Sequence, residues 1–306
     1  MVEILTGFAV IALAVLAGYL AVRLGILTVS AGPVLTRLNF NILMPPLLFS
    51  VLATADVGAL FSSLLPVSAI AAVTMMVVSA LVSKLVWRQD LGHTVVGALC
   101  ASYLNANNIG IPIAIYMLGD GAYAAPILLL QLMVFMPVAL GLLDVGSSGR
   151  VSLPRLLRTT FTNPLIVGSL LGLLVAVLGV ELPPIVLEPL SSLGHAAVPI
   201  ILISLGISMA GQRVLEPGTG RRAVAVATLL KLVAMPAVAY LVGRFGFGLA
   251  GHALYAVTVL AALPTAQNVF VYAQQYRVAE VLARDAVFVT TVGALPVLFG
   301  ISLLLG

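Results

Sequence analysis

Apolar segments long enough to cross a lipid bilayer follow one another along almost the whole chain. A membrane-spanning helix needs about 20 mainly apolar residues. Only 8% of the 306 residues are charged, against roughly 25% in soluble domains, so a water-facing surface could not be built from this chain. We therefore expect an all-α integral membrane protein with ten transmembrane helices. The expected spans are Ile4–Val22, Leu38–Ala55, Leu64–Trp87, Thr94–Leu118, Ala122–Leu143, Thr162–Val180, Pro189–Ala210, Ala223–Val242, Ala253–Gln274 and Val281–Leu305.

Basic residues alternate along the chain in a way that orients these spans. The loops after the first, third, fifth, seventh and ninth spans hold nearly all of the 14 Lys and Arg residues. The positive-inside rule then places these loops in the cytoplasm and both termini outside. We expect a multi-pass protein of the plasma membrane (the inner membrane in a bacterium), with the lipid bilayer and no nucleic acid as partner. The orienting residues are Arg23, Arg37, Lys84, Arg88, Arg150, Arg155, Arg158, Arg213, Arg221, Arg222, Arg277 and Arg284.

A long basic loop divides the ten spans into two sets of five. The predicted organisation is a first five-helix repeat at 1–145, a cytoplasmic linker at 146–161 and a second repeat at 162–306. Because five is an odd number, the two halves must be inverted relative to each other. A sliding match of the halves places Asn108 on Asn268. Inverted repeats are a recurring plan of secondary transporters.

Two expected spans contain residues that interrupt a helix near the middle of the membrane. The fourth span carries the run Asn105–Pro112 and the ninth carries Leu263–Asn268. Proline removes a backbone donor, glycine permits unusual dihedral angles, and the freed backbone groups need a partner inside the bilayer. The candidate binding residues are Asn105, Asn107, Asn108, Gly110, Pro112, Pro264, Thr265, Gln267 and Asn268.

Paired breaks in both halves of a transporter sequence indicate a binding site. The N-termini of the resumed half-helices would attract anions. The alternative is structural: two kinked helices whose amide side chains bond across to neighbouring helices.

These motifs resemble those of the auxin efflux carrier family, which includes plant PIN-type carriers and bacterial permeases labelled as malonate or organic-acid transporters. The matching stretches are Asn39–Pro46, Asn105–Pro112, Asn163-Pro164 and Leu263–Tyr276. The resemblance implies two inverted five-helix repeats in a sodium/proton antiporter-like arrangement, with a scaffold domain and a transport domain. It also implies that the fourth and ninth spans cross, with a small carboxylate bound near the crossing. Where the family has a proline before the asparagine of the fourth span, this chain has Leu104.

Three further polar residues lie within expected spans. Asn41 and His195 each precede a proline and could line the pocket, or bond between helices. Lys231 is the single charge deep in a span. It could neutralise an anionic substrate or take the place of a sodium ion, or it could snorkel to the cytoplasmic interface. Lys231 and His195 are thus the candidates for charge compensation or coupling.

Acidic residues fall at the ends of the expected spans or in loops, so an acidic proton relay is not expected. Arg277, Glu280, Arg284 and Asp285 are expected to form a solvated charge network. The sequence lacks a His-Glu-x-x-His motif and paired intramembrane aspartates. We therefore expect no enzyme, no cofactor and no metal.

The sequence thus predicts a secondary active or facilitative transporter for a small organic anion, an auxin-like or malonate-like mono- or dicarboxylate. Transport would proceed by alternating access, with a proton or a sodium ion as a candidate coupling partner. The alternative is a carrier of amino acids or other small metabolites coupled to sodium or protons, and a further alternative is an ion channel. An apolar scaffold face would suit a homodimer.

Overall fold

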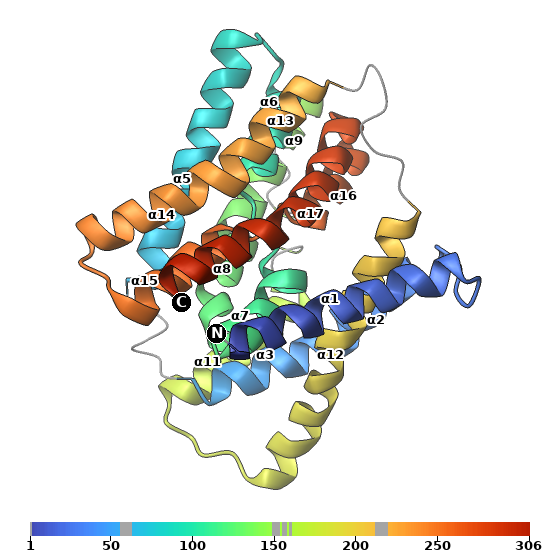
Figure 1. The fold of residues 1–306 in the computed structure, drawn as a ribbon, viewed down its shortest axis with the longest axis vertical. Coiled ribbons are helices and arrows are strands. Elements are labelled where there is room, and N and C mark those ends of the chain that lie inside the picture. Colours follow the sequence, from blue (N-terminus) through green and yellow to red (C-terminus); the bar gives the residue numbers. More distant parts are fainter. Residues whose placement is uncertain (1, 56–62, 149–153, 155–157, 159–160, 212–219) are drawn as a thin grey trace. The chain divides into compact units, whose positions relative to one another are not determined.

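Helices make up the regular secondary structure of the part of the chain that the structure describes, apart from one isolated β-bridge. This computed structural model describes residues 2–55, 63–148, 154, 158, 161–211 and 220–306 (Figure 1). Within these residues, six helices are long and apolar enough to cross a membrane, as in an all-α, multi-pass membrane protein. They are Ala31–Ala53, Leu64–Val86, Gly121–Ser147, Pro184–Ala210, Arg221–Gly246 and Glu280–Leu305. Shorter apolar helices cover Ala9–Arg23, Leu91–Ser102, Pro164–Val177 and Gly251–Ala261.

The chain packs into two compact units, and each draws on both halves of the sequence. The first unit comprises Met1–Phe61, Ile111–Leu129 and Thr159–Gln212, and the second comprises Ser62–Gly110, Leu130–Arg158 and Arg213–Gly306. The predicted repeat boundaries at 1–145 and 162–306 are a different division and stay a prediction. Most of the predicted linker at 146–161 lies outside the described residues.

Glycines allow close helix packing in the first unit. A side chain at Gly18 of α1 would overlap the backbone of Ile203 in α12, and one at Gly206 of α12 would overlap the backbone of Val15 in α1. Small residues permit this approach of backbones in membrane proteins. α1 and α12 therefore lie side by side (Figure 1). The unit contains α1 (Val2–Arg23), α2 (Ala31–Leu38), η1 (Asn39–Leu43), α3 (Met44–Ala53), α7 (Ile111–Met117), η4 (Gly121–Ala124), α11 (Pro164–Val177), α12 (Pro184–Ala210) and the start of α8 (Ala125–Leu130).

The second unit holds both interrupted helices and the helices packed around them. α6 packs against α5 and α9, and α17 packs against α13, α15 and α16. The unit contains α5 (Leu64–Leu81), η2 (Val82–Val86), α6 (Leu91–Ser102), η3 (Ala106–Gly110), η5 (Gln131–Phe135), α9 (Met136–Ser148), α13 (Arg221–Leu229), η6 (Leu230–Ala234), α14 (Met235–Leu241), η7 (Val242–Gly246), α15 (Gly251–Ala261), α16 (Gln267–Tyr276) and α17 (Glu280–Leu305).

Prolines explain several π-helical turns within the long helices. η1, η5 and η6 are each followed by a Met-Pro pair, and the methionine N–H donates to the carbonyl five residues earlier: Met44 to Asn39, Met136 to Gln131 and Met235 to Leu230. Proline lacks an N–H and its ring clashes with the carbonyl four residues before it. A wider turn before the proline relieves that clash and keeps the helix continuous. The long spans therefore bend without breaking at these prolines.

Helix boundaries differ from the expected spans mainly where proline is present. α12 begins at Pro184, whereas we expected the seventh span to begin at Pro189. Proline is well tolerated in the first turn of a helix, and Pro189 and Pro199 are both accommodated inside α12. The second span likewise begins at Ala31, seven residues before the predicted Leu38.

The predicted solvated charge network at the start of α17 is wrong for Asp285. Asp285 is fully buried, and Arg284 Nε donates to Asp285 Oδ1 at 2.8 Å. The pairing is therefore between adjacent residues and not between residues one helical turn apart. Periodicity could not predict this, because burial of Asp285 follows from the helices packed on α17.

Candidate functional site

The two interrupted helices meet at their breaks. α6 ends at Ser102 and α15 ends at Ala261, and the chain resumes helical structure at Ala106 and Gln267. Between these points Leu104 and Thr265 form an antiparallel β-bridge. Its two backbone hydrogen bonds run from Asn105 N to Pro264 O at 2.8 Å and from Ala266 N to Tyr103 O at 3.0 Å. The predicted interruption of both spans is confirmed, and each break supplies partners for the other.

A glutamine side chain forms hydrogen bonds with the backbone N–H and carbonyl groups of Leu104, which the bridge does not use. Gln131 Oε1 accepts from Leu104 N at 2.6 Å, and Gln131 Nε2 donates to Leu104 O at 3.0 Å. A primary amide offers the same donor and acceptor as a peptide group, so Gln131 takes the place of a third strand. Gln131 is 2% exposed and begins the π-helical turn η5. The non-helical backbone at Leu104 is thereby bonded on both sides, as an apolar surrounding requires.

Threonines secure the other break. Thr265 N donates to Thr290 Oγ1 of α17 at 3.1 Å, and Thr265 Oγ1 donates to Cys100 O in the last turn of α6 at 2.6 Å. Thr265 and Thr290 are both fully buried. Thr265 therefore ties together α6, α17 and the break before α16. Because its hydroxyl donates to the backbone of α6, we assign Thr265 a role in holding the shape of the site and not in contacting the ligand.

The asparagines of the fourth span form a short chain of amides that reaches α16. Asn105 Oδ1 accepts from Asn108 N at 3.2 Å, Asn107 Nδ2 donates to Asn108 Oδ1 at 2.8 Å, and Asn108 Nδ2 donates to Gln267 Oε1 at 3.3 Å. Among the described residues, Asn105 Nδ2 and Asn107 Oδ1 are buried without a hydrogen-bond partner. Buried polar atoms without partners are costly, so this cluster is equipped to bind one further polar group.

The first turn of α16 adds backbone donors to the cluster. α16 begins at Gln267 after Ala266, and no side chain caps its first N–H groups. Asn268 is half-buried in this turn. The uncapped N-terminus of a helix carries partial positive charge and favours anions. At the facing break, a side chain added at Gly110 would come within 2.8 Å of Leu263 Cδ1, so the lack of one permits close approach to Leu263.

Lys231 points into the protein. Its Nζ donates to Ala261 O at 2.8 Å and contacts Met235 Sδ at 3.3 Å, and the side chain is fully buried. The snorkelling interpretation of Lys231 is therefore wrong. Ala261 is the last residue of α15 before the break, where helix carbonyls carry partial negative charge. The lysine thus places an amino group at the end of the helix that leads into the site.

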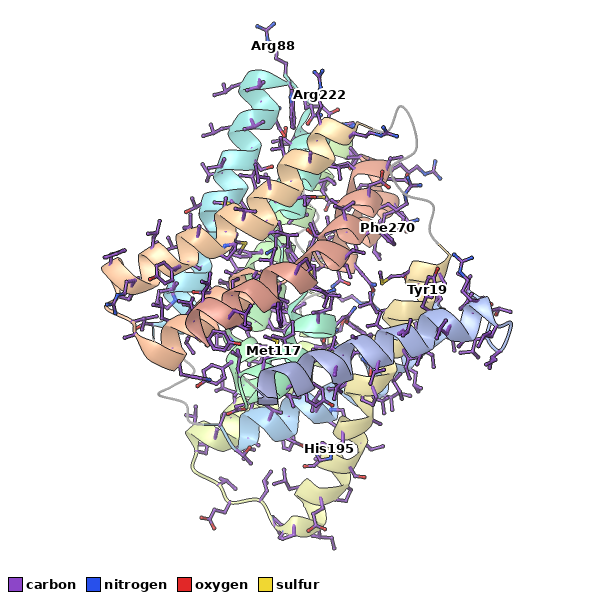
Figure 2. The ribbon with its side chains drawn as sticks, in the orientation of Figure 1. Tyr19, Arg88, Met117, His195, Arg222 and Phe270 are labelled. Carbon is purple, nitrogen blue, oxygen red and sulfur yellow. The ribbon has the colours of Figure 1, made fainter. Side chains whose placement is uncertain are left out.

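The predicted binding and coupling residues of the second unit lie at or near the two breaks. Three other predicted residues belong to the first unit. Pro112 is buried in α7. Asn41 is exposed and its Nδ2 donates to Arg37 O one turn earlier at 2.9 Å. His195 lies exposed on α12 (Figure 2). The buried amide in this segment is Asn39, whose two polar side-chain atoms have no partner among the described residues.

Sequence reasoning missed Gln131 and Thr290. Gln131 is an isolated amide within the apolar run Ala125–Phe135, and a lone polar residue in a span is a recognised signal of interhelical bonding. Thr290 carries no comparable signal, because threonine is common in membrane helices and bonds to its own helix. Thr290 Oγ1 does so here, donating to Ala286 O at 2.6 Å.

Comparison with known proteins shows the family to which the chain belongs. The family model described as "Membrane transport protein" matches residues 4–302. "Auxin efflux carrier component 1" of Arabidopsis thaliana is 32% identical over 162 residues, which cover 51% of this chain and 26% of that protein. "Probable auxin efflux carrier component 5c" of Oryza sativa subsp. japonica is 34% identical over 149 residues, 47% of this chain and 40% of that protein. The matched region thus spans well under half of these plant carriers.

A prokaryotic relative is similar over nearly its whole length. An "Uncharacterized transporter" of Methanothermobacter thermautotrophicus is 29% identical over 292 residues, covering 91% of this chain and 90% of that protein. The family model likewise covers almost the entire sequence. The chain therefore belongs to the membrane transport protein family of the auxin efflux carriers, a family of transporters and not of enzymes.

Proposed function

We propose that this transporter moves a small organic anion by alternating access and binds it at the paired breaks. The observation that carries the proposal is the amide cluster of Asn105, Asn107, Asn108 and Gln267 beside the bridge of Leu104 and Thr265, in which Asn105 and Asn108 are buried and the other two are half-buried. Asn105 Nδ2 and the N–H groups at the uncapped start of α16 offer hydrogen-bond donors to one ligand, and Asn107 Oδ1 offers an acceptor. A carboxylate accepts such bonds strongly because it is charged.

The proposed architecture is ten spans in two inverted repeats, with scaffold and transport domains. One break in each half of the sequence supports it, and the bridge that joins them relates Tyr103 to Pro264 and Asn105 to Ala266 by the local two-fold that any antiparallel bridge has. This two-fold relation is offset by one residue from the sequence match of Asn108 with Asn268. The location of the transporter in a bacterial inner membrane, with both termini outside, is part of the same proposal.

The proposed substrate is a mono- or dicarboxylate, auxin-like or malonate-like. The names of the plant relatives describe auxin efflux carriers, and the polar groups at the breaks suit a carboxylate without specifying the rest of the molecule. Lys231 is the proposed charge compensator because its ammonium group lies at the end of α15. His195 is exposed on α12 in the first unit and is retained only as a coupling candidate.

A carrier of amino acids or other metabolites coupled to sodium or protons is the second candidate. The carbonyl-bearing end of α15 favours it, since such ends coordinate cations in transporters, although Ala261 O is bonded to Lys231 in this chain. Transport by a channel would differ in kind, with high conductance and no counterflow. Counterflow of labelled substrate in proteoliposomes separates carrier from channel.

Replacing Asn108 or Asn268 by alanine tests the proposed site. We expect Asn108→Ala and Asn268→Ala each to weaken carboxylate affinity about tenfold or more, because a hydrogen bond to a charged group contributes roughly 1.5–3 kcal/mol. The measurement is uptake of labelled mono- and dicarboxylates by proteoliposomes. Gln275→Ala is the matched control, since Gln275 is an exposed amide on the same helix α16. Wild-type affinity in both site variants would overturn the proposal.

A further inference from the structure

An apolar groove with a basic end lies on the surface of the second unit, between α13 and α17. These helices lie side by side in Figure 1. The groove has a volume of about 540 Å³ and is lined by Val224, Thr228 and Leu232 of the α13–η6 helix and by Val289 and Val297 of α17, with Arg221 at its end. We name it the α13–α17 groove. Both helices are long and apolar enough to cross a membrane, so the groove faces hydrocarbon.

The length of the groove matches one leaflet of the bilayer. Arg221, Val224, Thr228 and Leu232 recur at helical spacing and form one stripe. At about 1.5 Å per residue, the stripe is about 16 Å long, close to half of the roughly 30 Å hydrocarbon core. The groove is therefore as long as a single acyl chain of one leaflet.

Positive charge at the Arg221 end of the groove favours lipids with anionic headgroups. Arg221 and Arg222 are exposed at the start of α13, and Figure 2 labels Arg222 there. The start of a helix adds partial positive charge and offers N–H groups suited to phosphate. The first turns of α17 carry Glu280 and an Arg284–Asp285 ion pair, so the three arginines of the two helix starts outnumber the two carboxylates. Basic pockets of this kind at the cytoplasmic interface bind anionic headgroups.

One hydroxyl oxygen lies beneath the lining of the groove. Thr228 Oγ1 is buried and has no hydrogen-bond partner among the described residues, although it lies in an otherwise apolar lining. A buried hydroxyl without a partner is unfavourable. Because this oxygen is not accessible at the groove surface, the lining between Arg221 and Leu232 offers apolar contacts to an acyl chain.

We propose that the α13–α17 groove binds an anionic glycerophospholipid, with the phosphate at Arg221 and one acyl chain along Val224 and Leu232. The site is independent of the substrate proposed above. A second apolar groove in the same unit provides an internal comparison. It lies between α5, α6 and α9, has a volume of about 450 Å³, and includes Val77 and no charged residue in its lining.

The test compares lipids of different charge and variants at both grooves. Purified full-length protein in detergent is titrated with phosphatidylglycerol or phosphatidylcholine of identical chains, and thermal unfolding and bound lipid by native mass spectrometry are measured. We expect phosphatidylglycerol to raise the melting temperature more than phosphatidylcholine does. Arg221→Gln and Ala225→Trp, which fills the groove, should each reduce bound phosphatidylglycerol several-fold.

The controls are Arg244→Gln and Val77→Trp. Arg244 lies in η7 at the other end of the same continuous helix, and Val77 lines the second groove, so both variants should keep the wild-type preference. Equal stabilisation by the two lipids, or equal losses in controls and groove variants, would overturn the proposal. So would stabilisation by inorganic phosphate alone that Ala225→Trp leaves intact, because the site would then bind an anion without a lipid chain.

Discussion

Three buried polar side chains in the second unit bond to backbone groups near the ends of the interrupted helices. Lys231 donates to Ala261 O, Thr265 donates to Cys100 O, and Gln131 bonds both polar backbone atoms of Leu104. A helix that stops inside the bilayer leaves carbonyl and N–H groups without intrahelical partners. These residues supply the missing partners, so their contribution to function is through the geometry and charge of the breaks.

At the residue scale, Lys231 provides the sharpest functional test. We expect Lys231→Gln to lower the preference for anionic over neutral substrates, because the variant removes the buried positive charge and retains a donor for Ala261 O. The measurement is the ratio of transport rates for a carboxylate and its neutral amide analogue, followed across pH. Lys84→Gln is the control, since Lys84 Nζ also donates to a backbone carbonyl, that of Gln89 at 3.0 Å, from an exposed position. Unchanged anion preference in Lys231→Gln would rule out the counter-charge role.

At the scale of elements, the breaks are defined by two strand-like segments and the side chains that flank them. The segment around Leu104 keeps this shape although it carries leucine where the resembling family has proline. Hydrogen bonds from the facing break and from Gln131 hold it extended. The conformation therefore depends on tertiary partners more than on the local residue.

Gln131 is accordingly predicted to be a positioning residue for the fourth-span break. Gln131→Leu leaves one buried N–H and one buried carbonyl of Leu104 without their partner, at a cost of about 1–3 kcal/mol for each group. We expect a lower melting temperature and a raised KM, both measured on purified protein. A protonated carboxyl group offers a donor and an acceptor, so Gln131→Glu should recover substrate affinity at acidic pH.

Gln275→Leu on α16 serves as the control for this pair of variants, because Gln275 is exposed. A Gln131→Leu protein with wild-type KM, even if less stable, would restrict Gln131 to a purely structural role. If Gln131→Glu does not recover affinity at any pH, the Gln131 side chain does not act by bonding to Leu104 as a neighbouring peptide group would.

At the scale of the whole molecule, the chain folds as two units that each combine sequence-distant segments. The first unit depends on close backbone contacts at glycine, and the second on polar bonds around the breaks. Each unit therefore has its own source of stability, and damage to one should be local.

Gly206→Ala tests this independence. The added methyl group would overlap the backbone of Val15 in α1, and overpacking of this kind costs typically about 1–3 kcal/mol. Hydrogen exchange measured by mass spectrometry should rise in α1 and α12 and stay unchanged in α15 and α17. Gly300→Ala in α17 is the control, because an added side chain there meets no atom within 4 Å. A uniform rise across both units would contradict the expectation.

The sequence by itself determined that the chain crosses a membrane, that it is helical, and that two spans break at Asn105–Pro112 and Leu263–Asn268. These properties follow from residue type and local order: apolar length sets the spans, and proline, glycine and asparagine disfavour a continuous helix. Helix ends were less predictable at Pro184 and Ala31, since proline both starts helices and is tolerated within them.

Tertiary structure alone decided which groups bond to the free backbone N–H and carbonyl groups of the two breaks. The pairing of Leu104 with Thr265, the bonds of Gln131 and Thr290, and the inward direction of Lys231 all join residues far apart in sequence. A side chain's rotation about its helix, and hence its partner, depends on which helices pack against it. Residue order fixes where hydrogen-bonding groups are freed, and only packing fixes which distant groups come within bonding distance of them.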